Sequence, residues 1–306
     1  MGTLESTPTG AADNVWGRIR ENRNSHGIRV PLPIAAVKLL GVRLLPAPAL
    51  RVARNAYYRY LRYRIRNAKL ATPIARRLGF VVQGGPFAGM RYPEEMVRAD
   101  IESPFMPKLL GCYEMECNPF IEEICSRPYD QVINIGASEG YYAVGLAMRM
   151  RTAKIVAFET SPGSRRLCER LARLNGVADR IELRGFCDRE SLAQSLADAS
   201  GRPQRTVVLC DVEGAERDLL QPDKIGLLAH ADLLVELHDF VSPGITDTIT
   251  ARFAATHRLE KVSNCERDLD AYAALNDLPR EQRAFFLSEH RTCTQYWMFC
   301  TSQDPQ

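Results

Sequence analysis

Short runs of apolar residues recur from about residue 131 onward, and polar or helix-like stretches separate them. The runs are rich in Val, Ile and Leu and end at turn residues, as is typical of strands buried in a parallel sheet. Because helical patterns alternate with them, we expect an α/β fold with a mostly parallel seven-stranded sheet and helices on both faces. The predicted strands are 131–135, 154–158, 180–185, 206–210, 232–237, 257–263 and 294–300.

The segment between the second and third strands has clear helix boundaries. Ser161 suits the N-cap position, Pro162 suits the first helical position, and Gly176 follows the last apolar residues. Upstream of the sheet, glycines and alternating residues predict a short β-hairpin over 79–93. A helix is expected over about 107–126.

The N-terminal part of the chain has a different composition. Residues 1–28 are polar and rich in Gly, Asn and Thr, so we expect a disordered leader. The stretch 31–50 is apolar, but two charged residues and four prolines interrupt it, so we reject a membrane span. The predicted segments are a leader (1–28), a basic helical extension (29–78), a hairpin and helix covering the α/β domain (79–126) and the α/β domain itself (127–306).

The net charge of +3 conceals an asymmetry. From Asn22 to Pro93 there are 14 Lys or Arg and no acidic residue, whereas the rest of the chain carries 26 basic and 37 acidic residues. A basic arm on an acidic body favours contact with an anionic partner. We expect either an anionic membrane surface bound through residues 31–78 or a polyanionic substrate, with nucleic acid less favoured. Part of this arm, 51–78, fits an interfacial amphipathic helix, or equally a basic helix packed on the body.

Nine cysteines are scattered along the chain without a CxxC pair, and the N-terminus lacks the pattern of a secretion signal. This usage favours free thiols in a reducing compartment. We therefore expect a cytoplasmic protein, with peripheral membrane binding as an alternative.

A glycine loop follows the first strand. Gly136 and Gly140 stand where the strand ends and a helix begins, which allows a tight turn and close approach of a ligand. Glu159 ends the second strand, at the distance typical of a ribose acceptor. A dinucleotide fingerprint would need glycines at Ser138 and Tyr141, whose side chains leave little room for a pyrophosphate. The loop therefore predicts S-adenosylmethionine (SAM) rather than NAD.

Further cofactor contacts are expected after the third strand. Asp188 could accept a hydrogen bond from the adenine amino group, or it could be the N-cap of the helix beginning near Arg189. Phe186 could pack on the adenine ring. The predicted SAM-binding residues are Asn134, Gly136, Ala137, Ser138, Gly140, Glu159, Phe186, Asp188 and Asp211.

With these features the chain resembles the FkbM-type SAM-dependent methyltransferases, through DVEGAE at 211–216 and VELHD at 235–239, supported by AFE at 157–159. The resemblance covers roughly 87–299. It implies a class I methyltransferase fold and transfer of the SAM methyl group, usually to oxygen, on sugars or natural products. Asn134 departs from the acidic residue that many methyltransferases carry there, although its amide oxygen could still accept from the methionine amino group.

Candidate catalytic residues lie at the ends of the fourth and fifth strands, where ligands bind in open α/β sheets. Asp211 ends the fourth strand, and Glu236 and His238 end the fifth. His238 is the first candidate for a general base because imidazole titrates near neutrality, and Asp211 is the second. In the alternative, Asp211 and Glu213 stabilise a turn and His238 caps a strand. A divalent metal on Asp211, Glu236 and His238 is conceivable but not favoured, because no compact ligand motif is present.

Glu289, His290 and Arg291 precede the last strand and belong either to the active site or to a solvated turn. Two other functions compete with O-methylation of a sugar, glycolipid or secondary metabolite. One is nucleic-acid methylation, against which no NPPY-type motif follows the fourth strand. The other is SAM binding without catalysis.

Overall fold

The computed structural model describes residues 69–98, 104–198, 201–202, 204–291 and 293–304. The chain divides into two compact units, and the larger one, Ala71–Glu289 with Thr294–Gln306, contains the whole sheet. The smaller unit, Met1–Leu70 with His290–Cys293, contributes few described residues. The predicted leader, the apolar stretch 31–50 and most of the basic extension therefore lie outside the described residues.

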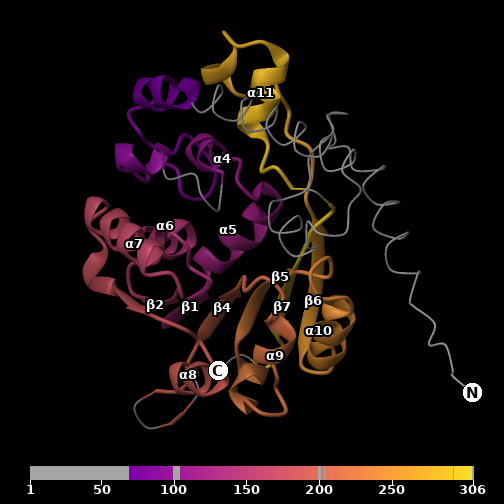
Figure 1. The fold of residues 1–306 in the computed structure, drawn as a ribbon. Helices are drawn as coiled ribbons and strands as arrows, with labels where there is room; N and C mark the ends of the chain where they lie inside the picture. Colours follow the sequence, from indigo (N-terminus) through magenta and orange to yellow (C-terminus); the bar gives the residue numbers. More distant parts are fainter. Residues whose placement is uncertain (1–68, 99–103, 199–200, 203, 292, 305–306) are drawn as a thin grey trace, which may run out of the picture. The chain divides into compact units, whose positions relative to one another are not determined.

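Seven strands form one sheet in the order β3-β2-β1-β4-β5-β7-β6 (Figure 1). The first five pair in parallel, and β7 runs antiparallel between β5 and β6. This is the Rossmann-like class I methyltransferase arrangement that the sequence predicts. The strands are β1 (Gln131–Ile135), β2 (Lys154–Phe158), β3 (Ile181–Arg184), β4 (Thr206–Cys210), β5 (Asp232–Leu237), β6 (His257–Ser263) and β7 (Tyr296–Ser302).

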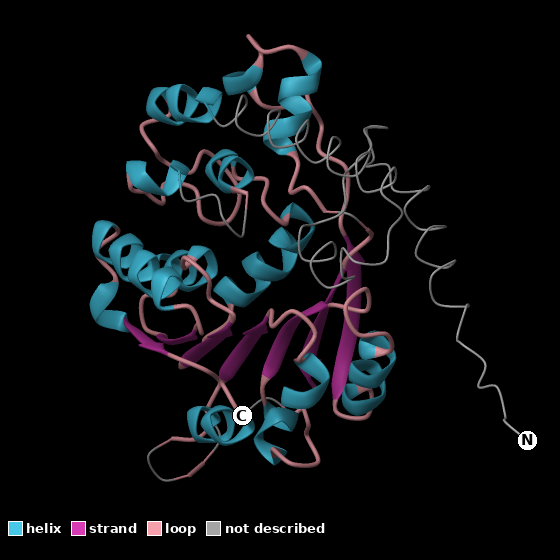
Figure 2. Ribbon diagram, in the orientation of Figure 1, coloured by secondary structure: helices cyan, strands magenta, loops and turns pink. Residues whose placement is uncertain are grey.

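Helices cover both faces of this sheet (Figure 2). One face carries α5 (Asn118–Ser126), α6 (Tyr141–Arg149) and α7 (Pro162–Leu174), with α4 (Phe105–Leu110) and α11 (Arg280–Leu287) farther from the sheet on the same side. The other face carries α8 (Arg189–Leu196), α9 (Glu216–Leu219) and α10 (Ile245–Phe253). Short 3-10 helices occupy Glu94–Arg98, Met115–Cys117, Ala178–Arg180, Gly226–His230 and Ala273–Leu275.

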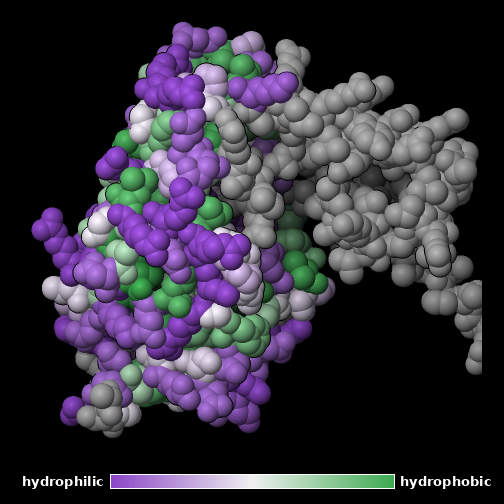
Figure 3. Space-filling model, turned by 60° about the vertical axis from the view of Figure 1, so that its left-hand side comes forward, coloured by the Kyte–Doolittle hydropathy of each residue, from purple (hydrophilic) through white to green (hydrophobic). Residues whose placement is uncertain are grey.

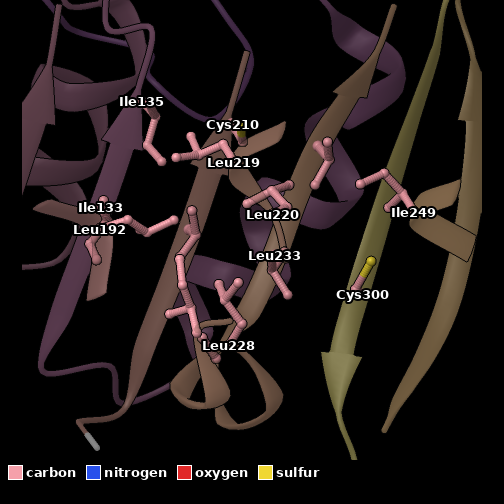
Figure 4. Packing of buried hydrophobic residues seen from close by; sticks show 14 of the residues in the cluster. Ile133, Ile135, Leu192, Cys210, Leu219, Leu220, Leu228, Leu233, Ile249 and Cys300 are labelled. Carbon is pink, nitrogen blue, oxygen red and sulfur yellow. The ribbon is translucent and has the colours of Figure 1, made fainter. Parts of the chain in front are cut away.

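One large cluster of buried hydrophobic residues lies between the sheet and the second helix layer (Figure 4). Ile133 and Ile135 of β1 point into it, together with Leu192 of α8, Leu219 of α9 and Ile249 of α10. Burial of each such side chain contributes roughly 2 kcal/mol to the free energy of folding. This packing fixes the strands, and with them the loops at their carboxyl ends.

Helix α7 begins and ends as the sequence predicts. The Ser161 hydroxyl oxygen accepts a hydrogen bond from the Ser164 N–H at 3.3 Å, and Pro162 is the first helical residue. Gly176, at φ +69°, follows the end of the helix. The segment is held by its caps, which explains why a local pattern sufficed to predict it.

Two predictions upstream of the sheet are met only in part. The 79–93 segment contains one antiparallel bridge, between Val81 and Arg91, and no strand, because the residues between them turn back at glycines with positive φ. The helix over 107–126 is interrupted: α4 ends at Leu110, and its C-cap residue Gly111 has φ +79°. A Cβ at Gly111 would stand 2.3 Å from the Gly84 backbone, so this break is where the two segments pack together.

The last strand is shifted by two residues from its predicted position. β6 ends at Ser263, which pairs with Tyr296, and Asn264 exchanges hydrogen bonds with the Gln295 backbone beyond that pair. The ladder therefore begins at Tyr296 rather than 294. The predicted third strand, 180–185, loses its first and last residues, because Arg180 belongs to a 3-10 turn and β3 ends at Arg184.

All nine cysteines are free, as predicted. Within the part of the chain that the structure describes, none of the helices combines the length and apolar character needed to cross a bilayer. On the face in Figure 3, hydrophilic residues predominate among the coloured atoms, and hydrophobic ones lie in smaller groups between them.

Candidate active site

The predicted glycine loop forms a tight turn between β1 and α6. Gly136, Ser138 and Gly140 all have positive φ, at +84°, +48° and +99°. A Cβ at Gly136 would stand 1.7 Å from the carbonyl oxygen of Asp211, so only glycine lets this loop lie against the end of β4. The sequence correctly places the loop, and the structure shows what it packs against.

Glu159 lies directly after β2 and holds this loop. Its Oε2 accepts a hydrogen bond from the Ser138 backbone N–H at 2.8 Å, and its Oε1 accepts from the Ser161 N–H at 2.7 Å. The carboxylate therefore links the glycine loop to the start of α7. Its role toward a ribose stays a prediction.

Asn134 lies within β1 and is 3% exposed. Its Oδ1 is buried and has no hydrogen-bond partner among the described residues. A buried acceptor without a donor is costly, typically by 1–3 kcal/mol, so this atom marks a place suited to a donor such as an ammonium group.

Asp188 is the N-cap of α8, because its Oδ1 accepts a hydrogen bond from the Ser191 N–H at 2.8 Å. That hydrogen bond lowers the pKa of the Asp188 carboxyl group. Phe186, two residues earlier, is 74% exposed. The capping interpretation of Asp188 is thus confirmed, and the adenine contacts of both residues stay predictions.

His238 is the centre of a group of carboxylates after β4 and β5. It is 1% exposed, and its Nδ1 lies 2.6 Å from Oε1 of Glu216. Its Nε2 lies 3.5 Å from Oδ1 of Asp211, 3.5 Å from Oε2 of Glu213 and 4.0 Å from Oε2 of Glu236. The structure therefore brings together the three residues predicted for catalysis, and adds Glu213 and Glu216.

These carboxylates change the acidity of the imidazole. Burial alone would lower the pKa of His238, but the hydrogen bond with Glu216 and the charges of Glu236 and Asp211 outweigh it and raise the pKa to about 9. The pKa of Asp211 is also raised, by burial in the site and by the Glu236 carboxylate. The sequence does not predict this raised pKa, because it depends on carboxylates that the fold brings to the imidazole.

The loop DVEGAE positions Glu213 and Glu216 on opposite sides of His238. Glu213 has φ +52° and Gly214 has φ +108°, which produces a sharp turn after β4. Glu216 is fully buried and accepts a hydrogen bond from the Gly214 N–H at 3.2 Å, in addition to its contact with His238. The motif was visible in the sequence, but the pairing of Glu216 with a residue 22 positions later was not.

Two further charged residues near the glycine loop were not predicted from the sequence. Glu114 is 3% exposed, accepts a hydrogen bond from the Tyr142 hydroxyl at 2.5 Å, and contributes to raising the pKa of Asp211. Lys108 is buried, forms an ion pair with Glu139 of the glycine loop, and lies 4.6 Å from the centre of the Tyr113 ring. Both residues lie in the stretch KLLGCYEME at 108–116, and no local pattern in that stretch predicts their roles.

Glu289 lies in a buried ion-pair group behind Glu114. It pairs with Arg267, which also pairs with Glu116 at 2.9 Å, and it accepts the Glu114 backbone N–H at 2.9 Å. The structure thus gives Glu289 a positioning role for the backbone of Glu114. His290 and Arg291 belong to the smaller unit, so their predicted active-site role stays a prediction.

Phe240 adds an apolar surface beside the cluster. Its ring centre lies 5.5 Å from that of His238, and the residue is 50% exposed. Val241, which follows it, is 51% exposed. Aromatic surface next to polar groups is the usual composition of a site for a small organic ligand.

The strand order gives this chain the Rossmann-like α/β fold of class I methyltransferases. No protein family model matches the sequence, and no curated protein matches it.

Several solved structures resemble the chain at low sequence identity. One of them is the O-methyltransferase TomG of Streptomyces achromogenes, which is involved in tomaymycin synthesis and was solved with SAM. It is 12% identical to this chain over 59% of this chain and 77% of its own length, with a TM-score of 0.41. A putative O-methyltransferase from Klebsiella pneumoniae is 10% identical over 77% of this chain and 90% of its own, at 0.39. The O-methyltransferase from Bacillus cereus, solved with SAH, is 11% identical over 59% and 78%, at 0.39.

Proposed function

We propose that this protein is a SAM-dependent methyltransferase that methylates a hydroxyl group on a sugar, glycolipid or secondary metabolite. The observation that carries the proposal is the meeting of the glycine loop with the end of β4, where Gly136 contacts the Asp211 backbone. This contact brings the predicted cofactor loop next to the His238 cluster. In open α/β sheets, ligands bind at such a point, where the strand order reverses.

The chain's own residues fit the proposed cofactor. Asn134 offers an unpaired buried acceptor for the amino group of the methionine part, and Glu159 stands at the end of β2 for the ribose. The positive φ angles at 136–140 let the backbone approach a ligand without side chains in between. When bound, SAM supplies a methyl group on a sulfonium, which an oxygen nucleophile can take in an in-line displacement.

The His238 cluster is the proposed place for the acceptor hydroxyl and its proton. Glu216 holds the Nδ1 side of the ring, so Nε2 is the atom that faces Asp211 and Glu213. A neutral imidazole at this position can accept a hydroxyl proton, and a positioned base typically contributes about 10²- to 10⁴-fold in rate. Phe240 next to the ring supports an acceptor with a sugar or aromatic face.

Calorimetric titration of the full-length protein with SAM and, separately, with NAD tests the cofactor. We expect saturable SAM binding and none with NAD. Release of S-adenosylhomocysteine in the presence of a panel of glycans then tests catalysis. Binding of NAD but not SAM would contradict the proposal, and SAM binding without turnover on any hydroxyl acceptor would favour a non-catalytic binding protein.

A further inference from the structure

Three donor atoms of different residues converge beside the carboxyl ends of β4 and β5. They are Nε2 of His238, Oδ1 of Asp211 and Oε2 of Glu213, all within 4.8 Å of one another. Asp211 follows the end of β4, His238 follows the end of β5, and Glu213 lies in the turn of the DVEGAE loop. Asp211 and Glu213 are two positions apart in the DVEGAE motif, and the fold brings His238, which is distant in the sequence, next to them.

The spacing of these atoms does not fit direct hydrogen bonds. Nε2 lies 3.5 Å from each of the two carboxylate oxygens, whereas a charge-assisted N–H···O bond is about 2.7–2.9 Å long. Donors bound at about 2.0–2.2 Å to a common cation lie roughly 3.0–3.5 Å apart, which matches this spacing. The Oδ1 of Asp211 is buried and accepts no hydrogen bond from any residue that the structure describes.

A second, independent observation comes from the far side of the imidazole. The fully buried Glu216 carboxylate lies 2.6 Å from Nδ1, so Nδ1 carries a proton toward Glu216 and the Nε2 lone pair can face the two oxygens. A carboxylate on the other ring nitrogen is the usual partner of a metal-binding histidine, because it fixes the tautomer and the ring orientation. A histidine that only caps a strand does not need such a carboxylate partner.

We propose that Asp211, Glu213 and His238 bind a divalent cation of the Mn²⁺ type. Two carboxylates and one imidazole suit an ion that accepts both oxygen and nitrogen ligands, whereas Mg²⁺ and Ca²⁺ prefer oxygen alone. Glu213 takes the place that the sequence suggested for Glu236, whose Oε2 is farther from Nε2, at 4.0 Å. Three protein ligands leave positions open for an oxygen of a substrate.

The cation changes the chemistry of the proposed site. With Nε2 bound to the ion, the imidazole no longer takes the acceptor proton, and the ion instead binds the acceptor oxygen and lowers the pKa of its hydroxyl. The proton then passes to Glu236 or to water. This role rests on the proposed function, but cation binding itself does not.

Calorimetry of the full-length, metal-free protein with MnCl₂ tests the site, and the loss of the free Mn²⁺ paramagnetic resonance signal gives a second readout. We expect one ion per chain with micromolar affinity, and Mg²⁺ or Ca²⁺ at least tenfold weaker. Glu213→Gln should weaken Mn²⁺ binding about tenfold or more. Because the Glu213 side chain is 78% exposed, this variant should fold normally. Glu169→Gln, an exposed carboxylate on α7, is the matched control and should bind as the wild type does.

Absence of saturable Mn²⁺ binding up to millimolar concentrations would overturn the proposal, as would equal affinities of Glu213→Gln and Glu169→Gln. SAM titration of the same samples separates the two proposals. Mn²⁺ binding without SAM binding would support the cation site and contradict the methyltransferase proposal. SAM binding without Mn²⁺ binding would support the methyltransferase proposal and contradict the cation site.

Discussion

At the scale of single residues, Glu159 combines two tasks. Its carboxylate receives backbone N–H groups from the glycine loop and from the start of α7, and it is the predicted partner of the ribose. A carboxylate can accept about four hydrogen bonds, so the two backbone bonds leave capacity for hydroxyl donors. The residue can therefore shape the loop and bind the cofactor at the same time.

We predict that Glu159→Ala weakens SAM binding about tenfold or more, because hydrogen bonds to a charged group are worth roughly 1.5–3 kcal/mol. Glu159→Gln, which keeps one acceptor oxygen, should lose less. Isothermal titration measures both, with Glu169→Ala as a control on an exposed face of α7. Wild-type affinity in Glu159→Ala would argue against the ribose role.

His238→Ala should lower turnover at least tenfold while leaving SAM affinity nearly intact. The reason is that His238 serves the acceptor side of the site, as a base or as a cation ligand. Initial rates with saturating SAM, combined with calorimetry, separate the two effects. His230→Ala is the matched control, since His230 precedes β5 at its opposite end. An equal loss of SAM affinity would contradict the assignment of His238 to the acceptor side of the site.

The raised pKa of His238 also predicts how stability depends on pH in metal-free protein. The folded pKa is about 9 against 6.5 for the unfolded chain, so this stabilisation is fully present below 6.5 and is lost as the pH rises through 9. The loss is on the order of 3 kcal/mol at most, from about 1.4 kcal/mol per pKa unit. Urea unfolding at pH 6 and above pH 9, in the presence of a chelator, measures it. The same pH dependence in His238→Gln would contradict the prediction.

At the scale of elements, the strands of the sheet could be predicted from the sequence, but the structure of the segments upstream of the sheet could not. Strands β1, β2, β4, β5 and β6 have their predicted bounds. The first four are mostly buried apolar runs that end at turns, whereas β6 is a partly exposed strand at the edge of the sheet. The break at Gly111 and the single bridge at 79–93 depend on packing between those two segments, which no local pattern shows. For the same reason Glu114 and Glu216 escaped prediction, since their partners are distant in the sequence.

Gly136 allows the most direct test of how the site is assembled. We predict that Gly136→Ala destabilises the protein by about 2 kcal/mol or more and weakens SAM binding, because the added Cβ overlaps the Asp211 carbonyl and φ is +84°. Denaturant unfolding measures the first effect. Gly163→Ala, in the first turn of α7 with only a 3.6 Å contact, should be neutral or slightly stabilising. A Gly136→Ala protein as stable as Gly163→Ala would show that the loop does not need this contact.

At the scale of the whole molecule, the charge asymmetry calls for a truncation with a defined limit. Residues 71–77 of the helix at 69–77 belong to the larger unit: Ala75 is fully buried, and Arg77 pairs with Asp277 at 3.1 Å. A truncation that tests the basic arm should therefore stop at residue 68.

If the arm binds anionic membranes, the protein lacking residues 1–68 should sediment less with phosphatidylserine vesicles than the full chain does. Vesicles of phosphatidylcholine alone are the control for non-specific association. SAM binding should be retained, because the described site lies outside the deleted residues. Equal sedimentation of both proteins with both vesicle types would leave the arm with another role.

The contact between Gly136 and Asp211 has a thermodynamic consequence. No side chain separates the cofactor loop from the backbone that carries an acceptor-side ligand, so a ligand that shifts one shifts the other. Such linkage is reciprocal: if SAM raises the affinity for a cation or an acceptor by some factor, that partner raises the affinity for SAM by the same factor. The order in which the ligands arrive then does not change the final free energy of the complex.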